Sequence, residues 1–244
     1  MDQAAIAAAS GLHSRIQALD ILSNNLANSS TAGYKLDREF YSLFSGESQS
    51  DIDGVSELPF VKSQWTDFSQ GTLTPTGNPL DLALTGQGFF MVNGPKSPLY
   101  TRNGEFQLSA DGTLVTAEGY PVVGVDGPIQ AQPGQKIDIG QDGTVTQGGN
   151  TIGQLQIVDF HDRRVLKKQG GSYFVNSQPS QKPVPSPASV AQGQLEGSNV
   201  VPAESAVQLV GVMRQFEMLQ KAVMQTTEMD KQALQEVARV GGGS

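Results

Sequence analysis

The sequence contains no cysteine and only two histidines, so several common kinds of site have little to build on. Without cysteine, disulfide frameworks and thiolate metal sites are excluded. His13 falls in a segment with helical periodicity, and His161 lies beside charged residues at an expected strand end. We interpret both as surface residues, so neither a Ser-His-Asp triad nor a histidine-rich metal site is indicated.

Positive charge and long apolar runs are also scarce. The 244 residues carry a formal net charge of -8 and the sequence pI is about 4.7, which disfavours nucleic acid and anionic membrane surfaces as partners. No apolar run approaches the roughly 18 residues that a membrane-spanning helix needs. The N-terminus lacks the basic and apolar regions of a cleaved signal peptide, so we expect any export to retain it.

Glycine-rich and acidic motifs do not combine into a site. Gly86-Gln87-Gly88 is not followed by the third glycine of a dinucleotide-binding loop. Asp51-Ile52-Asp53-Gly54 begins like a calcium loop, but Val55 and Lys62 occupy positions that should carry oxygen ligands. No pattern singles out a glycosidase-like pair among the 24 carboxylates. We therefore expect no catalytic residue, no metal, no cofactor and no enzymatic activity.

Apolar periodicity is the main feature of both ends of the chain. Residues 3–31 and 203–240 each predict a long amphipathic helix with a narrow apolar seam that repeats every seven residues. The seam residues are Leu12, Ile16, Leu19 and Leu26 in the first helix, and Leu209, Val212, Phe216, Leu219 and Val223 in the second. A narrow seam favours partner helices, so we expect a coiled-coil-like bundle. An intramolecular helical hairpin that covers a core is the alternative.

The region between about residues 70 and 175 predicts β-structure. Short apolar or alternating runs predict strands at four places: 80–84, 89–92, 153–160 and 171–175. Asp111-Gly112-Thr113 and Asp142-Gly143-Thr144 predict two hairpins, because the favoured turns need positive φ. The proline-rich residues 176–194 are interpreted as a loop or linker.

These elements predict an α+β protein in which a mostly antiparallel β-domain is carried between two terminal helices. The predicted segments are an N-terminal helical assembly domain (1–35), an extended connector (36–75), the central β-domain (76–195), a C-terminal helical assembly domain (196–240) and a flexible tail (241–244).

Three motifs, in order, resemble the rod and hook axial proteins of the bacterial flagellum. They lie at the end of the first helix, in the β-domain and just before the last helix. Their residues are Asn24, Asn25, Leu26, Ala27, Asn28, Thr31, Gly33, Tyr34 and Lys35; Gly86, Gly88, Phe89, Phe90, Tyr100, Thr101, Arg102 and Gly104; and Ser198, Asn199 and Val200. We expect the asparagine amides to bond backbone groups left free at the helix end. Residues 45–66 match no pattern of the family.

A fourth, shorter motif bears on the position within the family. The run 214–218, with Lys221, is similar to the proximal-rod version, whereas distal-rod proteins usually carry Arg-Ala-Tyr-Glu there. The chain is also shorter than most hook proteins. A proximal-rod subunit is therefore expected, with a distal-rod or hook subunit as the alternative. Arg214, Glu217 and Lys221 form either a solvated charged stripe or ion pairs between subunits.

The resemblance implies a structural subunit of the rod, the driveshaft that crosses the periplasm and transmits motor torque to the hook. Its partners would be further copies of itself, other rod proteins and the flagellar type III export apparatus, with no nucleic acid and no membrane insertion. Its terminal helices would pack into an inner tube, so folding and assembly would be coupled. A self-assembling appendage outside flagella and a peptidoglycan-cleaving enzyme are the rival hypotheses.

Overall fold

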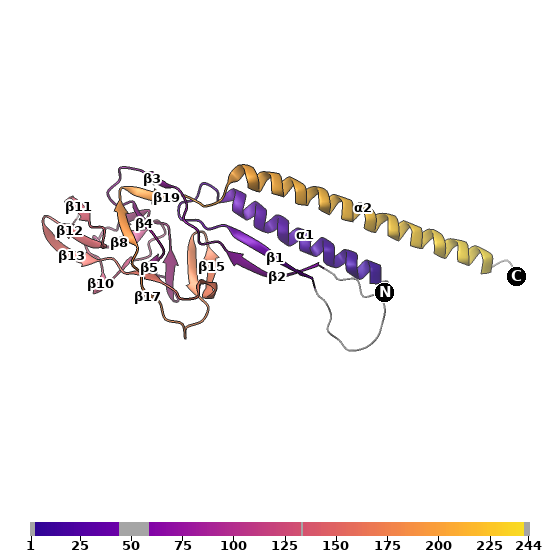
Figure 1. Ribbon diagram of the computed structural model, residues 1–244, viewed down its shortest axis with the longest axis horizontal. Coiled ribbons are helices and arrows are strands. Elements are labelled where there is room, and N and C mark those ends of the chain that lie inside the picture. Colours follow the sequence, from indigo (N-terminus) through magenta and orange to yellow (C-terminus); the bar gives the residue numbers. More distant parts are fainter. Residues whose placement is uncertain (1–2, 44–58, 133, 242–244) are drawn as a thin grey trace. The chain divides into compact units, whose positions relative to one another are not determined.

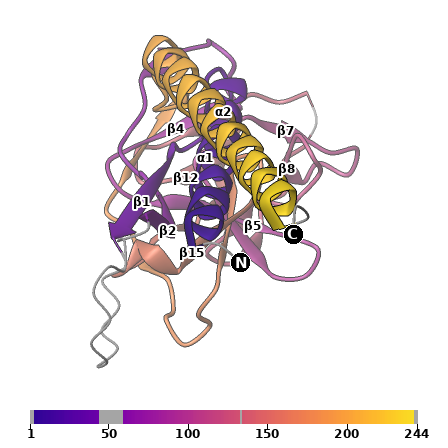
Figure 2. The same cartoon turned by 90° about the vertical axis from the view of Figure 1, so that its right-hand side faces the viewer.

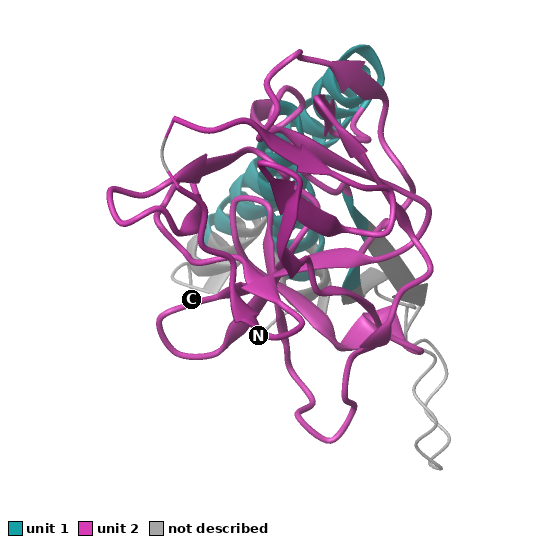
Figure 3. Ribbon diagram, turned by 90° about the vertical axis from the view of Figure 1, so that its left-hand side faces the viewer, with its two compact units in different colours: residues 1–26, 37–65, 201–244 teal, residues 27–36, 66–200 magenta. Residues whose placement is uncertain are grey.

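The computed structural model describes residues 3–43, 59–132 and 134–241. The chain divides into two compact units (Figure 3), of which unit 1 comprises residues 1–26, 37–65 and 201–244 and unit 2 comprises residues 27–36 and 66–200. Unit 2 thus includes a short N-terminal segment as well as the middle of the chain. No helix in the described ranges is long and apolar enough to cross a membrane. The five segments expected above remain a prediction.

Unit 1 contains two helices and a two-stranded sheet. Helix α1 (Gln3–Ala27) lies between helix α2 (Pro202–Gly241) and the paired strands β1 (Asp37–Leu43) and β2 (Pro59–Thr66) in both Figure 1 and Figure 2. Pro202 occupies the first turn of α2, where its missing N–H has no helical partner to lose. Two terminal helices were therefore predicted correctly, although α1 ends before the expected residue 31.

The predicted coiled-coil-like bundle is wrong. The structure has two helices and a β-rich centre, and no such bundle forms among the described residues. In a coiled coil each seam side chain inserts between four residues of the facing helix, yet Ile16 is 44% exposed and the α2 seam is only half-buried. Among residues 10–27, the part of α1 whose burial the structure describes, the buried residues are Ser14, Ala18 and Asn25, which share a different face from the seam. This face carries small side chains and one hydrogen-bonded amide. A heptad pattern is recognised by large apolar residues, so it does not indicate this face.

Unit 2 consists of short strands. Six of them form one antiparallel sheet in the order β15-β16-β6-β5-β14-β17, and β11, β12 and β13 form another. The remaining strands pair as β3 with β19, β4 with β18, β7 with β8 and β9 with β10. The bounds are β3 Leu73–Pro75, β4 Leu82–Thr85, β5 Phe89–Asn93, β6 Pro98–Thr101, β7 Phe106–Leu108, β8 Leu114–Thr116, β9 Val123–Gly124, β10 Gly127–Pro128, β11 Ile137–Ile139, β12 Thr144–Gln147, β13 Asn150–Gln154, β14 Ile157–Asp159, a 3₁₀ turn Arg163–Val165, β15 Leu166–Gly170, β16 Tyr173–Asn176, β17 Val184–Pro185, β18 Ser189–Gln192 and β19 Gln194–Glu196.

Both predicted hairpins are confirmed. The first Asp-Gly-Thr turn joins β7 to β8 and the second joins β11 to β12. Gly112 and Gly143 have φ values of 81° and 80°, as such turns require. The proline-rich residues 176–194 were expected to be a loop, but they contain β17 and β18. Pro185 is tolerated in β17 because that strand lies at the sheet edge.

The region around the expected connector is only partly described. Residues 45–58, which include the calcium-like stretch from Asp51, lie outside the described residues. Residues 59–66 form β2, so the end of this region belongs to a strand pair rather than to an open connector.

The six-stranded sheet carries a core on each face. Successive residues of a strand point to opposite faces, so Phe89 joins one core while Phe90 joins the other. The smaller core is aromatic, with Tyr100 and Phe160 edge to face and their ring centroids 4.9 Å apart. The Phe89-Phe90 pair of the second motif thus lies at the centre of the unit.

Candidate functional site

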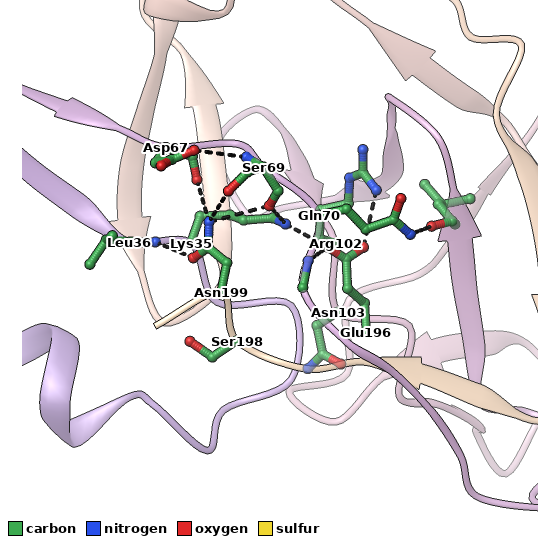
Figure 4. Close-up of polar contacts among 12 residues, drawn as sticks. Lys35, Leu36, Asp67, Ser69, Gln70, Arg102, Asn103, Glu196, Ser198 and Asn199 are labelled. Atoms are coloured by element: carbon green, nitrogen blue, oxygen red, sulfur yellow. Dashed lines mark hydrogen bonds and ion pairs between the residues drawn. The ribbon is translucent and has the colours of Figure 1, made fainter. Parts of the chain in front are cut away.

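Residues from all three motifs meet in unit 2, in a cluster drawn in Figure 4. We define the Glu196 cluster as Lys35, Arg102, Glu196 and Asn199. Lys35 lies eight residues after the end of α1, and Arg102 directly follows β6. Glu196 is the last residue of β19, and Asn199 lies in the segment between β19 and α2. Segments that are far apart in the sequence therefore converge on one carboxylate.

Glu196 is the centre of the cluster. Lys35 Nζ donates to Glu196 Oε1 at 2.5 Å and Arg102 Nη1 donates to Glu196 Oε2 at 3.0 Å. The backbone N–H of Gly71 donates to Oε1 at 3.0 Å. The three charged side chains are 0–3% exposed. The buried carboxylate therefore has a donor on each oxygen, which a buried charge requires.

The two cations are held by carbonyl oxygens as well. Lys35 Nζ donates to the Ser69 carbonyl oxygen at 2.6 Å. Arg102 Nη2 donates to the Gly86 carbonyl oxygen at 2.8 Å, and its guanidinium carbon lies 5.5 Å from the centroid of the Phe89 ring. These contacts tie the loop before β3 and the turn after β4 to the same cluster.

Hydrogen bonds from backbone N–H groups join the segment after α1 to the segment before α2. The Gly33 N–H donates to the Glu196 carbonyl oxygen at 2.7 Å, and the Leu36 N–H donates to Asn199 Oδ1 at 2.7 Å. Asn199 Nδ2 in turn donates to the Asp67 carbonyl oxygen at 2.8 Å. Residues 33–36 are therefore fixed to residues 196–199 at both ends of the stretch.

Gly33 is required by the close approach of two backbones. Its φ is +67°, and a Cβ at this position would lie 2.1 Å from the Asn103 backbone nitrogen. A glycine after a helical segment favours a helix stop at that position, but α1 ends six residues before Gly33. Next to it, Tyr34 is buried under Lys168, whose Nζ lies 3.9 Å from the ring centroid and donates to the Lys35 carbonyl oxygen at 2.8 Å.

Burial dominates the electrostatics of the cluster. It lowers the pKa of Lys35 below its ordinary value, and the negative charge of Glu196 opposes this shift only in part. The pKa of Arg102 is lowered for the same reason, again against the influence of Glu196. Buried charge networks often add little net stability compared with apolar residues of equal volume, but they penalise other arrangements of the same groups. The cluster is thus suited to fixing one geometry.

The asparagines of the first motif have separate roles. Within unit 1, Asn25 Nδ2 donates to the Asp37 carbonyl oxygen at 2.8 Å and the Asp37 N–H donates to Asn25 Oδ1 at 3.0 Å. Asn25 thus pairs with the first residue of β1, which the sequence did not indicate. Asn28 Oδ1 accepts a hydrogen bond from Thr31 Oγ1 at 3.2 Å, and Asn24 is exposed.

The other residues of the second motif mainly support the sheet, although the Gly86 carbonyl oxygen and the Phe89 ring also contact Arg102. Gly104 packs so closely that a Cβ would lie 1.8 Å from the Leu82 carbonyl oxygen. Thr101 Oγ1 donates to the Ser172 carbonyl oxygen at 3.0 Å. The other members are core residues or turn glycines: Gly88, Phe89, Phe90 and Tyr100 are buried, and Gly86 is exposed with φ +104°.

The predicted residues of the helices are not brought into the cluster. In α1, Leu12, Leu19 and Leu26 are half-buried, and Ala27 is exposed. In α2, the seam residues are half-buried, while Arg214, Glu217 and Lys221 are exposed. Of the third motif, Val200 is buried and Ser198 is half-buried. The assembly role of all these residues remains a prediction.

Glu196 is the important residue that was not predicted as part of a site, together with Ser69 and Gly71. The one signal in the sequence was its position two residues before Ser198, at the start of the third motif. Its partners, however, lie 161 and 94 residues away in the sequence, beyond any local pattern. Across the described ranges, no group of three or more His, Asp and Glu side chains is placed to hold a metal ion.

Three sequence profiles match the chain at the positions of the three motifs. The profile of the "Flagella basal body rod protein" family matches residues 7–35. That of the "Flagellar hook protein FlgE/F/G D1 domain" matches residues 83–147. That of the "Flagellar basal body rod FlgEFG protein C-terminal" matches residues 191–236. Each partner in the Glu196 ion pairs therefore comes from a different matched region.

Individual proteins with these names are similar over almost their whole length. The flagellar basal-body rod protein FlgF of Caulobacter vibrioides is 32% identical, over 91% of this chain and 92% of its own. FlgG of Agrobacterium fabrum, also a flagellar basal-body rod protein, is 33% identical over 91% and 94%. FlgF of Salmonella typhimurium is 29% identical over 96% and 98%.

Proposed function

Since the chain belongs to the family of flagellar basal-body rod proteins, we propose that it is a structural subunit of the bacterial flagellar rod that assembles with other rod components in the basal body. The similarity over at least nine tenths of the chain to relatives named FlgF and FlgG supports this. The observation that carries the proposal is the Glu196 cluster, since it unites all three family segments in one buried network.

The cluster is proposed to be a mechanical joint. Lys35 follows the end of α1 by eight residues, and Glu196 precedes the start of α2 by six. Both helices are therefore covalently attached to it by short segments. A buried carboxylate that accepts a hydrogen bond on each oxygen from a different segment has few alternative arrangements of similar energy. Torque applied to the helices would then pass into the β-structure of unit 2 without loosening the attachment.

The terminal helices are proposed to be the polymerising surfaces. Their seam residues are half-buried or exposed in the single chain, so apolar area remains to be removed from water. Burial against neighbouring subunits would contribute about 25 cal/mol per Å² of apolar area, which offsets the ordering entropy of the helices. Assembly through these surfaces would connect the subunit to copies of itself and to other rod proteins.

The finer assignments are also proposals. The 214–218 run and the chain length favour the proximal rod over the distal rod, although relatives named FlgF and FlgG are equally similar in sequence. The subunit is proposed to be part of the periplasmic rod, after export through the flagellar type III apparatus without a cleaved signal peptide. We propose no enzymatic activity, because the three charged side chains of the Glu196 cluster are buried and the carboxylate is paired on both oxygens.

Deletion of the gene tests the function directly. The expected result is non-motile cells whose purified basal bodies carry truncated rods and no hook, and the stub length would separate proximal from distal positions. Complete rods without hooks would indicate that the protein is a hook subunit instead. Swimming cells with intact basal bodies would contradict the proposal.

A single substitution tests the helical surface. Phe216→Asp places a charge in the half-buried α2 seam, and we expect it to abolish assembly while the β-structure of unit 2 stays folded. Gln215→Asp is the matched control, because it adds the same charge at an exposed neighbouring position. Motility and circular dichroism of both variants provide the measurement. Restored swimming with Phe216→Asp would show that this seam is not needed.

A further inference from the structure

Methionine is distributed unevenly in the chain. Four of the six methionines, Met213, Met218, Met224 and Met229, lie on α2 and are 48–69% exposed. Met91 lies in β5 and packs half-buried against the aromatic core. Met1 lies outside the described residues. Exposed methionines are therefore concentrated on α2, one of the two helices that are proposed to join subunits.

The spacing of these residues places them on two faces of α2. Met213 and Met224 are eleven residues apart, as are Met218 and Met229, and eleven residues make about three helical turns. Each pair therefore shares a face of α2. Val207, which is also exposed, continues the second face eleven residues before Met218. A contact with a neighbouring subunit on either face would cover thioether groups.

Methionine suits such a contact while it is reduced. Its side chain is unbranched and polarizable, so it fills irregular apolar gaps. Oxidation to the sulfoxide makes the same side chain polar and chiral and disrupts methionine-rich interfaces. The exposed sulfurs of α2 are therefore both the adaptable part of the surface and its chemically vulnerable part.

We propose that Met213, Met218, Met224 and Met229 form a site of oxidative modification, and that the oxidant is a hydroperoxide. Their oxidation would prevent a free subunit from assembling. This inference rests on the proposed function, since it assumes that α2 is covered in the rod. The sulfur attacks the peroxide, the O–O bond breaks and an S–O bond forms. The sulfur loses two electrons, and hydrogen peroxide is reduced to water. A thiol-dependent sulfoxide reductase would restore the thioether.

Mass spectrometry of the purified chain tests the site without reference to assembly. After treatment with hydrogen peroxide, the four α2 methionines are expected to gain oxygen several-fold faster than Met91, which serves as the internal control. Equal oxidation of Met91 and the α2 methionines would overturn the site. A variant with all four methionines changed to leucine keeps the apolar volume and helix propensity but has no sulfur to oxidise on α2.

The consequence is tested in cells that complete their basal bodies after a pulse of hydrogen peroxide. We expect incorporation of the wild-type chain to fall several-fold, while the four-leucine variant is incorporated as in untreated cells. A variant with Met218→Gln and Met229→Gln, which mimics the polarity of the sulfoxide, should be poorly incorporated without peroxide. Equal losses for the wild-type and leucine chains, or normal incorporation of the glutamine variant, would overturn the inference. Absence of the untreated wild-type chain from basal bodies would instead contradict the proposed function.

Discussion

Replacement of Glu196 by glutamine should be the most damaging isosteric change in the Glu196 cluster. The glutamine keeps the shape but removes the negative charge that pairs with two buried cations, Lys35 and Arg102. Its NH₂ group would also point at a cationic donor. Removal of one partner from a buried ion pair costs about 3–5 kcal/mol. That is a large part of the roughly 5–15 kcal/mol by which folded domains are stable.

The neighbouring change Lys35→Met should cost less. Glu196 would keep its hydrogen bonds from Arg102 and the Gly71 N–H, so the carboxylate would remain paired. The loss is limited to the bonds of Nζ to Glu196 and to the Ser69 carbonyl oxygen. Each of these two bonds to a charged group contributes about 1.5–3 kcal/mol. No buried charge is left without a partner, however, whereas Glu196→Gln leaves two buried cations uncompensated, and this difference places Lys35→Met below Glu196→Gln. The two changes should not add in the double variant, because they remove the same ion pair.

Urea unfolding provides the assay. Four of the five tyrosines, Tyr34, Tyr100, Tyr120 and Tyr173, belong to unit 2, so near-ultraviolet circular dichroism reports mainly on its packing. A lower midpoint with an unchanged slope would register the loss of stability. Glu105→Gln, at an exposed position, is the matched control and should change stability by no more than about 0.5 kcal/mol. If Glu196→Gln is as stable as that control, or more stable than Lys35→Met, the central role of Glu196 is refuted.

Two further predictions concern backbone packing and pH. Gly104→Ala should destabilise unit 2 by about 1–3 kcal/mol, because its Cβ would collide with the Leu82 carbonyl oxygen. Gly211→Ala, which has open space around it in α2, should instead stabilise the protein by about 1 kcal/mol. Equal thermal midpoints for the two variants would refute the steric argument. Burial, reinforced by the hydrogen bond to Glu118, raises the pKa of Tyr173. Its contribution to stability should therefore be complete below the ordinary tyrosine pKa of about 10 and be lost as the pH rises through the raised value. When phenolate absorbance is titrated, the Tyr173→Phe variant should lack one group that ionises at high pH in the wild-type protein. Tyr100, whose pKa is also raised by burial, remains in both proteins as the reference.

Local sequence patterns correctly predicted the hairpin turns and the start of α2, whose formation depends on residues close together in the sequence. The Asp-Gly-Thr turns need only a glycine at positive φ between strand-forming residues, and both hairpins formed there. The start of α2 at Pro202 follows from the proline and the apolar periodicity after it. The bundle was mispredicted because the heptad pattern depends on apolar character, while the buried face of α1 over residues 10–27 is made of Ser14, Ala18 and Asn25.

The family, the two terminal helices and the β-rich centre were predictable from the sequence, because motifs and periodicity are properties of short segments. The buried network of Lys35, Arg102 and Glu196 became visible only in the folded chain, since these pairings span 161 and 94 residues. The folded chain also shows that Gly33 serves a close backbone approach rather than the helix end. Both results depend on which surfaces meet when the chain folds, and the energy of a buried charge is set by those distant partners.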